Sequence, residues 1–366
     1  MSAIAYYITA HGYGHTVRSR EVIRALKSAC PDAAVYIRSA APQWLFENLA
    51  FPVAYRHGAV DVGFLQKDSL EMDVVATLAA CAAFHERIPQ LLEEEIGFLR
   101  DAKVRLIIGD IPPLCFEAAA RASLPSVAIA NFTWDWVYRS YFAAHGSFAP
   151  VIEAMTGSYR KATLALSLPF SCDMSVFGKT VPIPLIARVS ALSKEEARKK
   201  FQLPSAAKIV LISFGGFGLE RLPWDKLERL NDFFFVCTGT APKKGKNFLV
   251  FPEALPDYVD LVRAADAVVT KPGYGIVADV IAHRTPVLYT SRGQFPEFPY
   301  LVRALTDWAT SEFVPQDALL EGNLAPYLER LLNKDPNWPH VPLNGAEIAA
   351  KKILSLLSSF PPKGRP

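Results

Sequence analysis

The chain has 366 residues, of which 51% are hydrophobic and 20% are charged, and this composition suits two globular domains and excludes a disordered chain. The formal net charge of +3 is too small to indicate nucleic-acid binding. Five scattered cysteines without a Cys-x-x-Cys pair argue against a disulfide framework and against a zinc site. The sequence shows neither a signal-peptide pattern nor an apolar run of the ~18 residues that a membrane helix needs, so we expect a soluble, cytoplasmic protein.

In the first half, short apolar runs alternate with segments of helical period, which is typical of βαβ units and a parallel sheet. Strands are predicted at residues 4–9, 34–37, 106–108 and 126–130, and helices at residues 16–28 and 70–99. Pro89 should break or kink the long second helix, because proline removes a backbone donor. The pattern predicts an α/β domain over residues 1–182.

The same alternation restarts after a proline-containing, charged stretch at residues 181–204, which we interpret as the interdomain connection. Strands are predicted at residues 209–213, 233–237, 267–270 and 287–289, helices near Pro256, Gly275 and Phe298, and a last helix at residues 345–358. We expect a second α/β domain over residues 183–343. Residues 344–366 are expected to form a C-terminal helix that packs back on the first domain.

A histidine- and glycine-containing loop follows the first predicted strand. Because ligands of open parallel sheets bind at the carboxyl ends of strands, His11, Gly12, Gly14 and His15 stand at a functional position. The glycines permit a tight turn with backbone N–H groups at a helix start, which suits an anion or a polar ligand. The loop is not a dinucleotide fingerprint, because Val17 stands at the place of the third glycine. The alternative is an ordinary turn with incidental histidines, but two histidines within five residues favour a function.

An acidic residue, Asp110, directly follows the predicted strand at residues 106–108. If the two strands are close in the sheet, Asp110 can hold the His15 imidazole in one tautomer and raise its basicity, as general-base catalysis requires. The alternative is that Asp110 caps the helix after the two prolines. The spacing alone leaves both interpretations open.

Two loops of the second half carry residues suited to a phosphorylated ligand. Glycines at residues 213–218 let a phosphate or sugar approach the backbone. At residues 270–275, Lys271 and a helix start form a potential anion site, and Asp279 lies one turn further on, where it can bind ribose hydroxyls. A capped helix with an exposed acid is the alternative. A polar cluster at residues 292–297 follows the next strand and adds to the same edge of the sheet.

Several motifs are missing from the sequence. It contains no Asp-x-Asp pair, so a metal–diphosphate site of that kind is not supported, and it contains no P-loop and no nucleophile elbow. An aromatic segment at residues 131–138 either stacks against a sugar or aglycone or forms part of the core.

Six segments, three in each half, together carry a resemblance to a known family. They are HGYGHTVR (11–18), DVGFLQKD (61–68), NFTWDW (131–136), SFGG (213–216), KPGYG (271–275) and FPEFPYL (295–301). On these segments the chain resembles the glycosyltransferase-like N-terminal region of L-arabinokinase and its stand-alone bacterial relatives. More distantly it resembles the lipid-linked N-acetylglucosaminyltransferase of peptidoglycan synthesis.

The resemblance implies the GT-B fold, in which two Rossmann-like α/β domains with parallel sheets face each other across a cleft that holds the active site. It implies an acceptor domain at residues 1–182 and a nucleotide-sugar donor domain at residues 183–343, with His15 and Asp110 as the catalytic pair. The donor-binding residues that it implies are Gly14, Gly215, Gly216, Lys271, Gly273, Tyr274, Gly275, Asp279, Gln294 and Glu297. The expected acceptor-binding residues are His11, Asp61, Trp134 and Asp135.

The chain departs from the family pattern at two positions. Asp279 stands where the ribose acid is usually Glu, and Phe298 stands where arabinokinase-like relatives carry a second acid beside Glu297. No sugar-kinase half follows, so kinase activity is not carried over.

The sequence therefore predicts an inverting, metal-independent glycosyltransferase. It would move a sugar from a nucleoside-diphosphate sugar, a UDP-sugar, to a hydroxyl acceptor, without a further cofactor. One alternative is a non-catalytic sugar-nucleotide-binding module that regulates or contacts a partner, because the resembled region is joined to a kinase elsewhere. The other is a sugar-nucleotide epimerase or hydrolase of GT-B fold, which is less favoured because Glu297 is the only clear acid near the expected sugar position.

Overall fold

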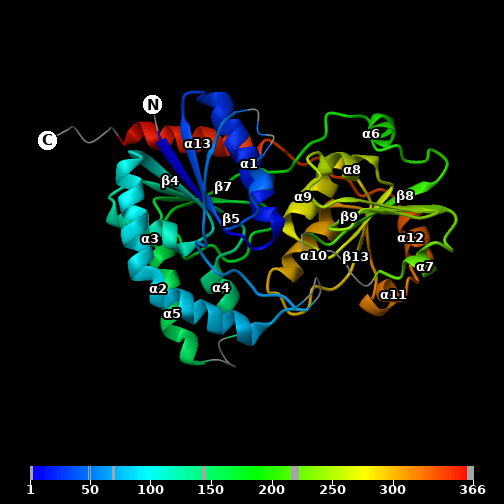
Figure 1. Ribbon diagram of the computed structural model, residues 1–366, viewed down its shortest axis with the longest axis horizontal. Coiled ribbons are helices and arrows are strands. Elements are labelled where there is room, and N and C mark those ends of the chain that lie inside the picture. The colour runs from blue at the N-terminus through cyan, green and yellow to red at the C-terminus, as the bar shows by residue number, and fades with distance from the viewer. Residues whose placement is uncertain are drawn as a thin grey trace. The chain divides into compact units, whose positions relative to one another are not determined.

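The computed structural model describes residues 3–47, 49, 51–67, 71–141, 146–215 and 222–360 (Figure 1). The chain divides into two compact units, each of which is described by itself. Unit 1 comprises residues 1–65, 73–186 and 342–366, and unit 2 comprises residues 66–72 and 187–341. Within the described ranges no helix combines the length and the apolarity needed to cross a membrane.

Unit 1 is built on a seven-stranded sheet in the order β3-β2-β1-β4-β5-β6-β7. The strands are β1 (Ala3–Ile8), β2 (Ala34–Ser39), β3 (Ala54–His57), β4 (Val104–Asp110), β5 (Ser126–Ala130), β6 (Leu164–Ser167) and β7 (Thr180–Pro182). All neighbouring pairs are parallel. The chain moves outward from β1 in one direction and from β4 in the other, so the strand order reverses between these two central strands. In sheets of this type the crevice beside such a reversal is where ligands bind.

Helices cover both faces of the unit 1 sheet (Figure 1). One layer contains α1 (Gly12–Ala29) and α13 (Gly345–Ser359), and the other contains α2 (Val74–Asp101), α3 (Pro113–Arg121), α4 (Trp134–Arg139) and α5 (Ala149–Tyr159). Two short 3₁₀ helices, η1 (Gln43–Phe46) and η3 (Gly146–Phe148), complete the unit.

The C-terminal helix α13 packs directly against α1 in unit 1. Gly345 is the first residue of this helix, and its backbone packs against the backbone of Pro184. A Cβ at position 345 would lie 2.1 Å from the Pro184 carbonyl oxygen, which is too close. The Gly345 N–H donates to the carbonyl of Leu185 at 3.2 Å. Close backbone approach therefore explains the glycine at the start of this helix.

Two local predictions for unit 1 are wrong. The helix expected from residue 16 begins at Gly12, because glycines are tolerated in the first turn, where backbone N–H groups have no intrahelical partner anyway. Pro89 does not end α2, which is continuous from Val74 to Asp101. Buried apolar residues on both sides of Pro89, such as Leu78 and Leu92, hold the helix against its neighbours.

Unit 2 has a second seven-stranded sheet, in the order β10-β11-β9-β8-β12-β13-β14. The strands are β8 (Lys208–Ser213), β9 (Phe233–Gly239), β10 (Lys243–Lys244), β11 (Phe248–Pro252), β12 (Ala267–Thr270), β13 (Val287–Tyr289) and β14 (Ser311–Phe313). All pairs are parallel except β10 with β11. Here the order reverses between β8 and β12, which repeats the arrangement in unit 1.

Helices also flank both faces of the unit 2 sheet (Figure 1). They are α6 (Lys194–Lys200), α7 (Trp224–Leu227), α8 (Tyr258–Ala264), α9 (Tyr274–His283), α10 (Phe298–Trp308), α11 (Gln316–Leu320) and α12 (Ala325–Leu332). A core cluster joins alternate residues of β8 and β9, such as Val210 and Phe235, to Leu227, Leu319 and Leu328 of α7, α11 and α12. The sequence expectation of two Rossmann-like α/β units with largely parallel sheets is confirmed.

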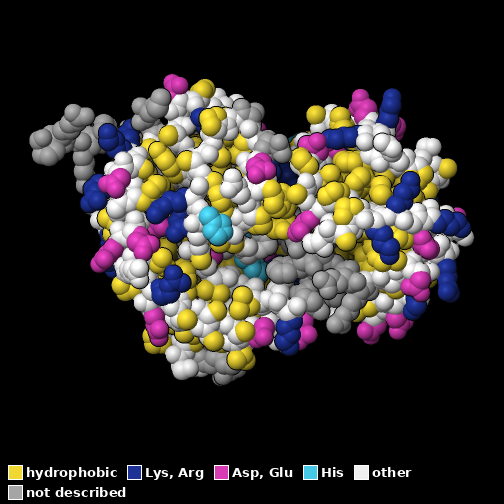
Figure 2. All heavy atoms as spheres, viewed as in Figure 1, with side chains coloured by type: hydrophobic (Ala, Val, Ile, Leu, Met, Phe, Trp, Pro, Cys, Tyr) yellow, Lys and Arg dark blue, Asp and Glu magenta, His cyan; other side chains and the backbone are white. Residues whose placement is uncertain are grey.

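Charged side chains do not gather into a patch of one sign on the face drawn in Figure 2, where Lys and Arg alternate with Asp and Glu. This distribution accords with the small formal charge of +3.

Candidate functional site

The strand reversal in unit 1 brings together the two residues predicted as the catalytic pair. Ile8 of β1 lies in register with Asp110 of β4, so α1, which follows β1, starts beside the end of β4. His15 lies in the first full turn of α1, and its Nδ1 is 2.7 Å from Oδ1 of Asp110. Both side chains are buried, with 8% and 0% of their surface exposed. The proximity that the sequence only suggested is therefore present.

Arg18 completes a charged network around Asp110. Its Nε and Nη2 donate to the two carboxylate oxygens at 2.6 and 2.5 Å, and its Nη1 donates to Oδ1 of Asn131 at 2.6 Å. Ser19 adds a fourth donor at 3.1 Å. Burial on its own raises the pKa of the Asp110 carboxyl, but Arg18 and His15 outweigh it and lower this pKa to about 2. Asp110 is therefore an anion at any pH at which the protein works.

The guanidinium of Arg18 limits what Asp110 can do for His15. Nδ1 of His15 carries the proton in this arrangement, because its nearest neighbour is a carboxylate oxygen that can only accept. Arg18 Nη2 also lies 2.9 Å from the same Nδ1, so a positively charged imidazole would face a second cation. Asp110 therefore fixes the tautomer and orientation of the ring more than it raises its basicity.

Arg18 and Asn131 were not among the predicted site residues. The sequence did contain a signal for Arg18, because a residue three positions after His15 on a helix lies on the same face. Asn131 directly follows β5, the neighbour of β4, and so belongs to the same edge of the sheet.

Three of the four residues predicted to bind the acceptor are linked through Trp134. Asp61 accepts from Thr9 Oγ1 at 2.9 Å and from the indole Nε1 of Trp134 at 2.8 Å. His11, the residue before α1, packs edge-on against Trp134 with ring centroids 5.2 Å apart, and its Nδ1 accepts from the Phe64 N–H at 3.1 Å. The structure thus brings Asp61, Trp134 and His11 together next to the start of α1.

Asp61 differs in its electrostatics from Asp110. Burial raises the pKa of the Asp61 carboxyl to about 6, although the hydrogen bonds from Thr9 and Trp134 act in the opposite direction. The carboxylate of Asp110 adds to the rise. Among the described residues, Asp61 accepts from two neutral donors and has no arginine like Arg18, so its charge is less well stabilised.

Asp135, the fourth predicted acceptor residue, lies in the first turn of α4 and is 4% exposed. Its Oδ2 accepts from Thr156 Oγ1 on α5 at 2.7 Å. The side chain is thus part of the contact between α4 and α5, and acceptor binding by Asp135 stays a prediction that this position does not favour.

The strand reversal in unit 2 places the two predicted phosphate loops next to each other. Ser213 of β8 and Thr270 of β12 are in register at the ends of their strands. Gly215 follows β8 with a φ of +72°, a conformation that favours glycine, and a Cβ there would have open space around it. Gly216 lies outside the described residues.

The second of these loops ends in the N-terminus of α9. Gly273 is the N-cap residue, with no heavy atom within 4 Å of the place of a Cβ, and Tyr274 and Gly275 form the buried first turn. Lys271 is partly exposed and donates to the side-chain oxygen of Gln66 at 3.4 Å. Backbone N–H groups at a helix start, together with a nearby ammonium group, are the elements of an anion site.

The two acids predicted near the donor are both paired with arginines. Asp279 is 1% exposed and accepts from the backbone N–H of Arg188 at 3.2 Å and from its guanidinium. Glu297 is 2% exposed and accepts from Arg292 Nη1 at 2.9 Å. Gln294, in contrast, is exposed. Contacts of these residues with ribose or sugar stay predictions, and a ligand would share Asp279 and Glu297 with their arginines.

Among the described residues, no group of three or more His, Cys, Asp or Glu side chains is arranged to hold a metal ion.

The comparisons with known proteins agree on the fold. No protein-family model matches the chain. It is 30% identical to L-arabinokinase of Arabidopsis thaliana over 356 residues, which is 94% of this chain and 33% of that protein. The chain is therefore homologous to L-arabinokinase but spans only about a third of its length.

Solved structures extend the likeness over both units. The glycotransferase of kitacinnamycin matches with a TM-score of 0.62 and 16% identity, over 98% of this chain and 95% of that one. UGT2 of Phytolacca americana, complexed with UDP-2-fluoro-glucose and pterostilbene, matches with a TM-score of 0.60 and 13% identity, over 98% and 95%. At this level of identity the matches show the fold, which is the GT-B fold of glycosyltransferases, as the sequence resemblance implied.

Proposed function

We propose that this chain of GT-B fold is an inverting glycosyltransferase that moves a sugar from a UDP-sugar to a hydroxyl acceptor without a metal ion. The observation that carries the proposal is the buried contact between His15 and Asp110, at the strand reversal of unit 1. An imidazole held in one tautomer by a carboxylate is suited to general-base catalysis near neutral pH.

The reaction assigns a role to each of these groups. With Nδ1 bonded to Asp110, Nε2 of His15 takes the proton of the acceptor hydroxyl. The acceptor oxygen then forms a bond to the anomeric carbon, while the bond from that carbon to the diphosphate oxygen breaks and UDP leaves. Attack on the side opposite the leaving group inverts the anomeric centre. Arg18 is a positioning residue, because it holds Asp110 rather than the substrate, and Asn131 in turn accepts from Arg18.

The donor side of the proposal rests on unit 2. UDP would place its diphosphate at the N-terminus of α9, where Gly273 leaves space beside the backbone and Lys271 adds a positive charge. Such donors stabilise the negative charge that develops as the diphosphate leaves. The choice of UDP is supported by the complex of UGT2 with UDP-2-fluoro-glucose, which shares the fold.

A non-catalytic sugar-nucleotide-binding module is the second candidate. It is favoured by the match to only a third of L-arabinokinase and by the arginines that occupy Asp279 and Glu297. This candidate keeps the donor site of unit 2 but assigns no turnover to His15.

A transfer assay separates the two candidates. The protein is incubated with a panel of UDP-sugars and mixed hydroxyl acceptors, with and without excess EDTA, and UDP release and the anomeric configuration of the product are measured. We expect a glycoside whose anomeric configuration is inverted relative to that of the donor. The rate of UDP release should be the same with and without EDTA. Loss of activity in EDTA that manganese or magnesium restores would contradict the metal-free mechanism. Tight UDP binding without any turnover would favour the module.

A further inference from the structure

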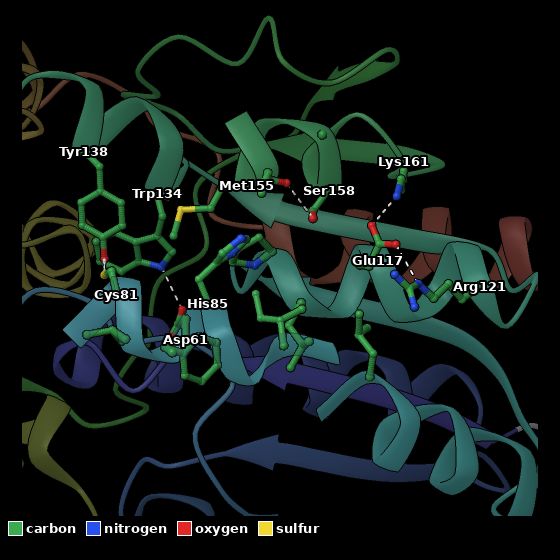
Figure 3. Close-up of a pocket in the computed structure, with 18 residues that line it drawn as sticks. Asp61, Cys81, His85, Glu117, Arg121, Trp134, Tyr138, Met155, Ser158 and Lys161 are labelled. Atoms are coloured by element: carbon green, nitrogen blue, oxygen red, sulfur yellow. Dashed lines mark hydrogen bonds and ion pairs between the residues drawn. The ribbon is translucent and has the colours of Figure 1, made fainter. Parts of the chain in front are cut away.

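Unit 1 contains a cavity of about 350 Å³ between α2, α3, α4 and α5 (Figure 3). Its wall is mainly apolar and is formed by Phe84, Ile88 and Leu92 of α2, Leu114 of α3, Trp134 of α4 and Met155 of α5. The volume lies within the range of roughly 300–1,000 Å³ that is typical of small-molecule pockets. Most of its lining belongs to helices, and Asp61 and Val62 of the loop between β3 and α2 also contribute to it.

One part of the cavity lining is polar, and its polar atoms can accept more hydrogen bonds than the described part of the chain supplies. Asp61 belongs to this part, and its two carboxylate oxygens accept one hydrogen bond each, from Thr9 and from Trp134. A carboxylate has about four lone-pair sites, so it can accept further donors. His85 of α2 also lines the cavity (Figure 3), and its buried Nδ1 has no hydrogen-bond partner among the described residues.

A further part of the lining carries ion pairs. Glu117 of α3 pairs with Lys161 and accepts from Arg121 Nε at 2.9 Å (Figure 3). These charges satisfy one another, whereas the donors to Asp61 in the part of the chain that the structure describes, Thr9 and Trp134, are neutral. A ligand in the cavity would therefore find its polar partner at Asp61 and His85 and apolar surface along the rest of its length.

The cavity is distinct from the predicted catalytic pair. Within the described part of the chain, neither His11 nor His15 belongs to its lining, and Trp134 lies between the cavity and His11. Burial also raises the pKa of Asp61, so a ligand that donates a hydrogen bond to this carboxylate would replace hydration that the cavity wall excludes.

We infer that this cavity binds a small, mainly apolar molecule of ring type, whose single hydroxyl group donates to Asp61. The ring system lies between Phe84, Ile88 and Met155, and the hydroxyl oxygen can in turn accept from His85 when Nδ1 carries the proton. Asp61 and Trp134 are also predicted to bind the acceptor, so the cavity adjoins that predicted site. Binding of the small molecule itself does not require sugar transfer, because no residue of the catalytic pair takes part in it.

A matched pair of probes tests the inference on the full chain. 2-Naphthol carries the hydroxyl donor, and 2-methoxynaphthalene has the same rings without it, and binding of each is measured by calorimetry. We expect one molecule of 2-naphthol per chain. Asp61→Asn should weaken 2-naphthol binding by roughly tenfold, as expected for a hydrogen bond to a charged group, and leave the ether unchanged. Asp101→Asn, on an exposed side chain of the same unit, is the control.

A second set of variants fills the cavity. Ala154→Phe and Gly157→Leu on α5 place larger side chains at lining positions, and Gly157 has open space at its Cβ. Both should abolish binding of the two probes, whereas Ala83→Phe, at an exposed position of α2, should not. The melting temperature and its shift with UDP verify that each variant is folded.

The outcomes separate this inference from the proposed function. Probe binding that survives both filled-cavity variants, or no binding by the wild type at millimolar probe, would overturn the cavity site. Equal affinity of Asp61→Asn for 2-naphthol would overturn the assignment of the hydroxyl to Asp61. A protein that binds the probe but never transfers sugar would leave the cavity site standing and refute the proposed function.

Discussion

Unit 1 and unit 2 both reverse their strand order between two central strands, and in both units the predicted site residues follow those strands. Their chemistry differs. In unit 1 the reversal holds a buried network in which Asp110 binds His15, Arg18 and Ser19. In unit 2 the corresponding loops offer backbone groups instead of a side-chain network. Gly215 follows β8 with a positive φ, and α9 starts after β12 without a side-chain cap.

This difference suits the two halves of a transfer reaction. A side-chain network can fix one proton-accepting atom, which is what the activation of a hydroxyl requires. A backbone cradle can bind a diphosphate regardless of the sugar attached to it. The same topology thus supports base chemistry in one unit and anion binding in the other, according to which residues follow the strands.

The largest expected effect follows from removing the proposed base in unit 1. His15→Ala should lower turnover by about 10²- to 10⁴-fold, the usual contribution of a general base. UDP binding should stay nearly unchanged, because all the predicted donor residues except Gly14 belong to unit 2. Turnover is measured by UDP release, and UDP affinity by calorimetry.

His57→Ala provides the matched control, because His57 is exposed at the end of β3 in the same unit. Wild-type turnover in His15→Ala would show that His15 is not the base. A loss of UDP affinity in His15→Ala would contradict the assignment of the base to unit 1 and of UDP binding to unit 2.

The architecture could be predicted from the sequence because strands and helices have strong periodic signals. Strands β5, β12 and β13 and the start of α10 were predicted at their observed positions. The short strands β3, β7 and β14 were missed, because polar residues or proline interrupt them and leave no apolar run like those of β12 and β13. The predicted break at Pro89 failed because tertiary packing outweighs the loss of one helical hydrogen bond.

Only some contacts of the candidate site could be predicted from the sequence. His15 and Asp110 could be paired because residues that follow neighbouring parallel strands must meet. The arginine partner of Asp279 could not be found, because Arg188 lies 91 positions before its acid and nothing in the local pattern links them. Arg292 lies only five positions before Glu297, in the polar cluster at residues 292–297, but their pairing was not predicted. The cavity beside Asp61 was also hidden, since it depends on how four helices pack.

An intermediate effect is expected from the anion site of unit 2. Lys271→Ala should weaken UDP binding by roughly tenfold, as loss of one charge-assisted contact costs about 1.5 to 3 kcal/mol. The measurement is the shift in melting temperature with UDP, because a ligand at 100 times its Kd contributes about 2.7 kcal/mol. Lys208→Ala, at the exposed opposite end of β8, is the control.

Turnover at saturating donor should fall much less in Lys271→Ala than in His15→Ala. If no nucleoside diphosphate shifts the melting temperature of the wild type at millimolar concentration, unit 2 does not contain the donor site. The contrast between the two units would then rest on unit 1 alone.

The smallest effect concerns the two carboxylates of unit 1, whose pKa values shift in opposite directions. The pKa of Asp110 is lowered to about 2, so its stabilising contribution is present above the ordinary value of 3.8 and is lost as the pH falls toward 2. The pKa of Asp61 is raised to about 6, so between pH 3.8 and 6 the folded chain binds a proton that the unfolded chain does not. The free energy of unfolding therefore decreases as the pH rises through this window.

Asp61→Asn isolates the second contribution, because an amide can still accept from the Trp134 indole and donate to the Thr9 hydroxyl. At pH 7 the variant should be more stable than the wild type by on the order of 1 kcal/mol, after allowance for the partial exposure of Asp61. Urea unfolding at pH 7, 6, 5 and 4, each value near or within the window set by Asp61, checks this. The advantage should shrink toward pH 4, where Asp61 of the folded wild type is already protonated. An advantage that stays constant across these pH values would mean that the carboxylate of Asp61 is as well stabilised as that of Asp110.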